Sequence, residues 1–154
     1  MKTRLMTAVL TLLWVAARPD AAFPQSRTEE VGRLTVQARY AEPAEGIVRF
    51  ALYAAEDDFL WRPIAVREEA LKDGMAEVSF TGVAEGEYAV SAYLDLNGNG
   101  ELDSRWYGAP SEPAGSSNDA KGRFGPPSWN DANFTLSDVG NSVSFTLACP
   151  VECD

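Results

Sequence analysis

The sequence predicts an all-β protein: a single antiparallel β-sandwich of about seven strands with one long loop. Three observations lead to this prediction: short segments in which apolar and polar residues alternate, turn-forming clusters between them, and one long stretch rich in Gly, Pro and Asn. Alternation with a period of two buries one face of a strand, and several short strands of this kind are typical of a sandwich. The 154 residues contain no internal repeat and suffice for one domain with a real core.

Six alternating segments are the clearest strands, in chain order 32–40, 47–53, 76–80, 88–94, 133–136 and 142–148. The turn cluster 41–46 makes the first two strands a predicted hairpin. Residues 54–74 allow two interpretations. A short helix is predicted over 66–72, and an edge strand with a loop is the alternative; Pro63 argues against one continuous element.

Residues 1–22 have the order of an export signal. Lys2 and Arg4 give a positive start, Leu5 to Ala17 form an apolar stretch too short to span a membrane, and small residues follow. A buried helix is the alternative, but no apolar face is visible. We expect cleavage between Arg18 and Phe23, and a mature protein with no membrane span in the periplasm or outside the cell.

The expected organisation therefore has four parts. A signal peptide covers 1–22 and a flexible lead covers 23–31. The sandwich covers 32–149, with its long loop at 96–130, and a tail covers 150–154. A loop this long without periodicity is unusual inside a compact domain and is often functional.

That loop begins with the stretch DLNGNGELD, in which oxygen-bearing residues recur at every second position. The predicted ligands of a calcium ion are Asp95, Asn97, Asn99, Glu101 through its carbonyl, and Asp103. They match positions 1, 3, 5, 7 and 9 of the EF-hand loop, with Gly100 at the sharp turn of position 6. The match ends there, because position 12 is Trp106 and a strand precedes the loop.

The sequence leaves open which residue supplies the remaining calcium ligand and whether the loop is an ion site at all. Glu112, Asp119 and Asp131 are the candidates for a missing ligand. An ordinary polar turn is the alternative to an ion site, since Asn-Gly pairs are common in turns. Magnesium is disfavoured because a flexible all-protein loop does not suit its strict octahedron.

Composition excludes several classes of function. The formal net charge is −10, and removing residues 1–22 takes away more basic than acidic residues, so nucleic-acid binding is not expected. The chain has no histidine, which removes the usual Ser-His-Asp, Cys-His and zinc chemistry. Cys149 and Cys153 are the only cysteines; we expect a disulfide in an exported protein, with free thiols or a metal pair as alternatives.

The aromatic side chains of the long loop are Trp106, Tyr107, Phe124 and Trp129. The favoured interpretation is a small satellite core that pins the loop. The alternative is a platform on which sugars or peptides stack.

From Gly86 to Leu136 the chain resembles DUF2141, a bacterial family of exported domains of unknown function. The shared elements are G-x-Y, D-x-N-x-N-G-x-x-D, G-x-P-x-E, S-N, P-P-[SW] and D-A-x-F. Leu94 stands where the family often has histidine. The segment Phe80 to Asp95 is also similar to transthyretin-like and carboxypeptidase-regulatory sandwiches. The resemblance implies a secreted sandwich and carries no activity.

The function expected from these observations is an exported, non-catalytic binding or accessory module with a calcium-binding loop. Its partner would be a protein or glycan outside the cytoplasm. A carbohydrate-binding module that uses Trp106, Tyr107 and Trp129 is the alternative, and a carboxylate-dependent hydrolase is a third interpretation.

Overall fold

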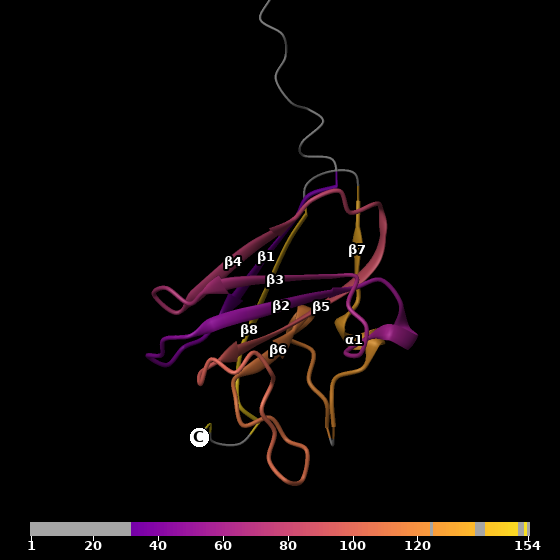
Figure 1. Cartoon of the computed structure of the whole chain (residues 1–154). Coiled ribbons are helices and arrows are strands. Elements are labelled where there is room, and N and C mark those ends of the chain that lie inside the picture. The colour runs from indigo at the N-terminus through magenta and orange to yellow at the C-terminus, as the bar shows by residue number, and fades with distance from the viewer. Residues whose placement is uncertain (1–31, 124, 138–140, 151–152, 154) are drawn as a thin grey trace, which may run out of the picture.

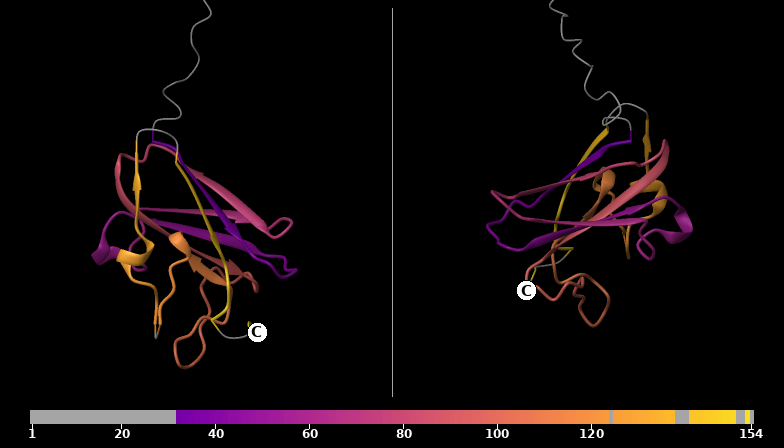
Figure 2. Two further views of the ribbon diagram at one scale, coloured as in Figure 1. Left: turned by 180° about the vertical axis from the view of Figure 1, so that it is seen from behind. Right: turned by 45° about the horizontal axis from the view of Figure 1, so that its top comes forward.

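The computed structural model describes residues 32–123, 125–137, 141–150 and 153. It confirms an all-β sandwich, with eight strands rather than about seven, in sheets of three and five strands (Figures 1 and 2). The strands are β1 (Leu34–Arg39), β2 (Ile47–Tyr53), β3 (Ala65–Ala70), β4 (Met75–Phe80), β5 (Gly86–Asp95), β6 (Ala114–Ser116), β7 (Phe134–Leu136) and β8 (Asn141–Thr146). Short helices are η1 (Glu56–Asp58), η2 (Ser117–Asp119) and α1 (Trp129–Ala132).

The core lies between the two sheets and follows the alternation in the sequence. In β1, Leu34, Val36 and Ala38 are fully buried, while the residues between them are partly exposed. In β2, Val48, Phe50 and Leu52 are fully buried, while the two residues between them are partly exposed. Each buried Leu, Val or Phe side chain of this set contributes roughly 1.5–3 kcal/mol relative to exposure to water. Burial of one face per strand is therefore the main force that pairs the sheets.

The predicted hairpin between the first two strands is wrong. β1 pairs with β4 and, in parallel, with β8, whereas β2 pairs with β3 and β5 in the other sheet. Residues 40–46 therefore cross between sheets, which lets the buried faces of β1 and β2 face each other. The β1–β8 pair is also the one parallel exception to the antiparallel order of the described strands.

The predicted helix over 66–72 is also wrong, because this segment contains β3. Ala65 to Ala70 pair antiparallel with β2 along its whole length. The strand lies at the edge of its sheet and none of its side chains is fully buried, so it lacks the alternation of a core strand. The edge-strand alternative is the one observed.

Residues 96–130 contain more structure than predicted. They include β6, η2 and the start of α1, which Ser128 caps by accepting the Asp131 N–H. A second buried cluster covers the outer face of the five-stranded sheet, away from the main core; its members are Tyr53, Phe59, Ala89, Trp129 and Ala132. Because this cluster covers β5 at Ala89, both Ala89 and Val90 are buried. The cluster does not extend to the other end of β5, where the loop after Asp95 packs on the outer face of the sheet.

The terminal predictions have different outcomes. Residues 1–22 and 23–31, predicted as signal peptide and lead, lie outside the described residues. Cys149 and Cys153 form a disulfide with Cα atoms 5.6 Å apart, as predicted. Among the described residues, no helix is long and apolar enough to cross a membrane.

Candidate metal-binding loop

Asp95 is the last residue of β5 and organises the loop that follows. Its side chain is only 5% exposed. One carboxylate oxygen accepts the Gly98 N–H at 2.6 Å, and the other accepts the Gly100 N–H at 2.8 Å. Both glycines have positive φ, 75° and 80°, a conformation that costs other residues energy. Position 1 of the predicted loop therefore holds the two turns together.

Asn97 and Asn99 converge on the Asp103 carboxylate. Their side-chain amides donate to the same Asp103 oxygen at 2.5 and 2.9 Å. Their own oxygens accept backbone N–H groups, Asn97 from Asn99 at 2.9 Å and Asn99 from Glu101 at 2.7 Å. Thus three of the predicted ligands, at positions 3, 5 and 9, meet at one point.

Two side chains on the outer face of the five-stranded sheet hydrogen-bond to the loop. Arg49 and Tyr93 are paired neighbours on β2 and β5, and both donate to the Gly100 carbonyl, Tyr93 at 2.9 Å. Arg49 also forms a salt bridge of 2.6 Å with Glu68 on β3. The φ of 80° favours glycine at position 100, and a Cβ there would meet the end of the Arg49 side chain at 2.9 Å, so Arg49 would have to shift.

This anchor also changes how the two side chains titrate. Burial raises the pKa of the Tyr93 hydroxyl, and the nearby Arg49 guanidinium opposes that shift. Hydrogen bonding with Tyr93 raises the pKa of Arg49, which burial opposes. The tyrosine therefore stays protonated at neutral pH and keeps donating to the loop.

Glu112 closes the loop on its other side. Its side chain is 4% exposed and accepts the Leu96 N–H at 2.8 Å and the Asp103 N–H at 3.2 Å. The carboxylate thus joins the residue after Asp95 to the last predicted ligand. Of the three candidates for a missing ligand, Glu112 is the one that reaches the loop.

The other two candidates lie elsewhere. An Asp119 oxygen accepts the Thr146 N–H at 2.7 Å, and Asp131 pairs with Ser128 at 2.6 Å. Within the described ranges, no three side chains of His, Cys, Asp or Glu are placed to hold a metal ion together. The oxygen donors of the loop are therefore a mixed set of carboxylates and amides rather than an acidic cluster.

The predicted aromatic group is divided between two places. Trp129 is 8% exposed and packs edge-on against Phe59 in the second buried cluster, with ring centroids 5.8 Å apart. Trp106 and Tyr107 are 95% and 50% exposed. The satellite-core interpretation is therefore right for Trp129 and wrong for the other two, and a platform containing all three does not exist. Phe124 lies outside the described residues.

Sequence reasoning missed Arg49, Tyr93 and the bracing role of Glu112. A charged residue inside β2 was the only available signal for Arg49, because its contact lies 51 residues away. The G-x-P-x-E element contained Glu112, but spacing alone did not show which backbone groups it binds.

A family model described as "Uncharacterized protein conserved in bacteria (DUF2141)" matches residues 36–144. This range includes most of the sandwich and the whole loop. Comparison with curated proteins and with solved structures gave no match.

Proposed function

The chain belongs to the DUF2141 family of bacterial proteins, and on that premise we propose that it is an exported, non-catalytic binding or accessory module whose 95–103 loop binds calcium. The observation that carries the proposal is the convergence of Asn97, Asn99 and Asp103 beside a position-1 aspartate that already holds the loop turns. An ion at this point requires the two asparagine amides to turn, because their nitrogens now face Asp103.

The donor set suits calcium. Calcium takes six to eight oxygen ligands in flexible geometry, and waters complete sets that the protein leaves short. Asp95 and Asp103 supply carboxylates, and each carboxylate keeps free lone pairs beyond the N–H groups it accepts. Turning the Asn97 and Asn99 amides would present oxygen where nitrogen now faces Asp103, at the loss of the two backbone N–H hydrogen bonds that these oxygens accept. With two carboxylates, we expect weak affinity, in the range of extracellular modules.

The non-catalytic part of the proposal rests on how the carboxylates are used. Asp95 and Glu112 are buried, and each accepts two backbone N–H groups that fix the loop. The chain has no histidine to act as a general base near neutral pH. These side chains are better explained as supports and ligands than as an acid–base pair.

Calcium is expected to stabilise the metal-stripped protein. With an assumed dissociation constant of ~0.1 mM, ~1 mM calcium adds about 1.4 kcal/mol to the free energy of unfolding by mass action. The melting temperature should then rise by a few degrees. Calorimetric titration and thermal melting of stripped protein, with and without chelator, measure this.

Asn97→Asp tests the effect of ligand charge, because it adds a carboxylate beside Asp103. Repulsion should lower the melting temperature without calcium, and the higher ligand charge should increase the calcium shift above that of the wild type. Absence of heat and of a melting shift in the wild type at several millimolar calcium would make the loop an ordinary polar turn.

Export is expected to leave a shortened protein. The charged, apolar and small residues of 1–22 support a cleaved signal, and the Cys149–Cys153 disulfide suits an oxidising compartment. Mass spectrometry of protein from the periplasm or medium of a bacterial host should find an N-terminus between Arg18 and Phe23. Recovery of the intact chain from Met1 in the cytosol would contradict export.

A further inference from the structure

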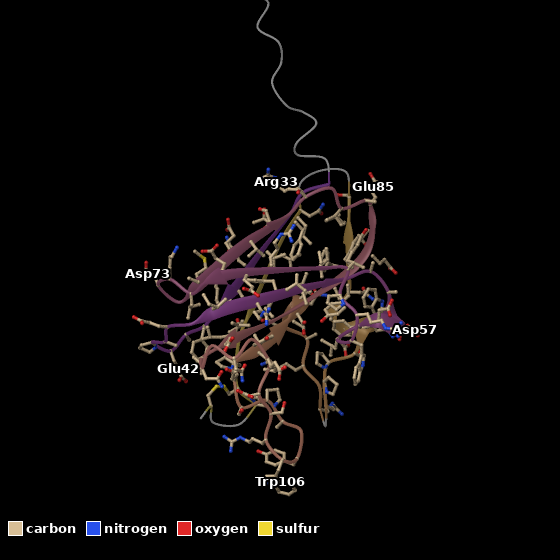
Figure 3. The ribbon with its side chains drawn as sticks, in the orientation of Figure 1. Arg33, Glu42, Asp57, Asp73, Glu85 and Trp106 are labelled. Carbon is tan, nitrogen blue, oxygen red and sulfur yellow. A yellow bond between two sulfur atoms is a disulfide. The ribbon has the colours of Figure 1, made fainter. Side chains whose placement is uncertain are left out.

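A tight turn at residues 105–108 presents two aromatic rings to solvent. The Arg105 carbonyl accepts the Gly108 N–H at 2.8 Å, and the Arg105 N–H binds the Ala109 carbonyl at 2.8 Å. Trp106 and Tyr107 occupy the two central positions, and their rings stand 83° apart with centroids separated by 5.3 Å. Figure 3 shows Trp106 at the extreme tip of the molecule, opposite Arg33. With 95% of it exposed, the Trp106 side chain adds almost nothing to the core.

The aromatic turn is tied directly to the predicted calcium loop. Its base is closed by a bridge between Ser104 and Pro110 and by a 2.9 Å hydrogen bond from the Ser111 N–H to the Asp103 carbonyl. Asp103 also contributes the carboxylate on which Asn97 and Asn99 converge. An ion that fixes the Asp103 carboxylate would therefore also restrain the base of the turn, because the carbonyl of the same residue accepts the Ser111 N–H.

The size of the aromatic surface limits what it can bind. Buried aromatic side chains cover roughly 150–250 Å² each, so two rings fall well short of the ~800 Å² per partner of a stable protein interface. A single sugar ring is of the right size to cover a tryptophan face. Its C–H groups pack on the ring, and its hydroxyls pair with polar neighbours such as the Tyr107 hydroxyl.

Charge narrows the ligand further. The chain carries a formal charge of −10, and Glu101 and Asp103 lie close to the turn in sequence, while Arg105 is the one basic residue of the turn itself. The overall negative charge disfavours nucleic acids, anionic polysaccharides and anionic lipid surfaces. A neutral ligand avoids this cost.

We propose that Trp106 and Tyr107 form a binding site for neutral carbohydrate chains, in which a sugar ring stacks on Trp106, and that calcium in the 95–103 loop strengthens this binding by ordering the turn. The calcium dependence rests on the proposed function, whereas the sugar contact does not. The site differs from the platform that was the alternative interpretation of the sequence, because Trp129 is excluded from it.

The test measures retention of the mature protein on insoluble neutral polysaccharides (cellulose, chitin and a β-glucan) in 1 mM calcium and in chelator. Anionic polysaccharide and vesicles of neutral and anionic lipid serve as competing surfaces. Wild type should bind at least one neutral polymer, Trp106→Ala should bind it at least tenfold more weakly, and chelator should weaken wild-type binding several-fold. Trp61→Ala is the matched control, because Trp61 is 85% exposed but belongs to the segment after η1, and it should bind like wild type.

Three outcomes overturn the proposal. One is no retention of wild type on any neutral polymer, the second is retention unchanged in Trp106→Ala, and the third is a preference for vesicles or the anionic polymer. Retention that is equal in calcium and chelator overturns the calcium dependence. Calorimetry of Trp106→Ala with calcium alone separates the two proposals: heat equal to wild type leaves the ion site intact even where sugar binding fails.

Discussion

Replacement of Glu112 by alanine is expected to lower the free energy of unfolding by about 3 kcal/mol and to expose residues 96–111 to protease. The substitution leaves the Leu96 and Asp103 N–H groups without the acceptor that now binds both. Hydrogen bonds to a charged group contribute roughly 1.5–3 kcal/mol each, and buried donors without a partner cost a similar amount. Urea unfolding and limited proteolysis of wild type and variant measure the two effects.

Two further variants make this result specific. Glu112→Gln keeps the volume of the side chain but offers one amide oxygen in place of two carboxylate oxygens, so it should lose at least half as much stability. Glu101→Ala changes an exposed side chain of the same loop and should stay within ~0.5 kcal/mol of wild type. If Glu112→Ala unfolds at the wild-type urea midpoint, the carboxylate does not brace the loop.

The core strands could be predicted because their pattern has a direct physical cause. β2 begins and ends where the sequence predicts, since Val48, Phe50 and Leu52 alternate with residues on the outer face. β3 could not be predicted with the same security. At the edge of the sheet none of its side chains is fully buried, so no alternation distinguishes it from a short helix.

Pairing between strands is the part that local pattern does not contain. Adjacent strands with a turn cluster between them resemble a hairpin, but β1 and β2 lie in different sheets. Each strand has one buried face, and that requirement is met equally well by pairing within a sheet or by facing across the core. The choice depends on partners that lie far along the chain, such as β8 for β1.

The same division applies to the loop. The every-second-residue spacing predicted that Asn97, Asn99 and Asp103 would meet, because a turn at Gly98 and Gly100 folds the chain over a short distance. Spacing did not predict the supports that come from other elements. Arg49 comes from β2 and Glu112 from the far side of the aromatic turn, so both lie outside the stretch whose spacing carried the prediction.

The G-x-P-x-E element gains a structural explanation from this arrangement. Gly108 adopts a φ of 88° in the aromatic turn, Pro110 bridges to Ser104, and Glu112 accepts backbone N–H groups at the two ends of the 95–103 loop. Its three fixed positions serve the turn, the bridge and the brace in order. The element therefore links the predicted ion site to the rings of Trp106 and Tyr107.

Replacement of Asp95 by alanine is expected to have the larger effect on both stability and calcium binding. Without calcium, the free energy of unfolding should fall by about 4 kcal/mol, because the Gly98 and Gly100 N–H groups lose a nearly buried carboxylate at 2.6 and 2.8 Å. In ~1 mM calcium the difference from wild type should widen by about 1.4 kcal/mol, since only the wild type gains from the ion. Urea unfolding of both proteins with and without calcium gives all four values.

Two controls separate the role of Asp95 in the turns from its role as a ligand. Asp95→Asn keeps one oxygen for the turns but removes the charge. Its free energy of unfolding should therefore fall by about half as much as that of Asp95→Ala, and calcium should have almost no effect on it. Asp119→Ala also removes a carboxylate that accepts a backbone N–H, from Thr146 at 2.7 Å, but it lies outside the loop. It should therefore lose stability while its calcium shift stays equal to that of wild type. A full calcium shift in Asp95→Asn would mean that the ion is held without the position-1 charge, and the proposed ligand set would be wrong.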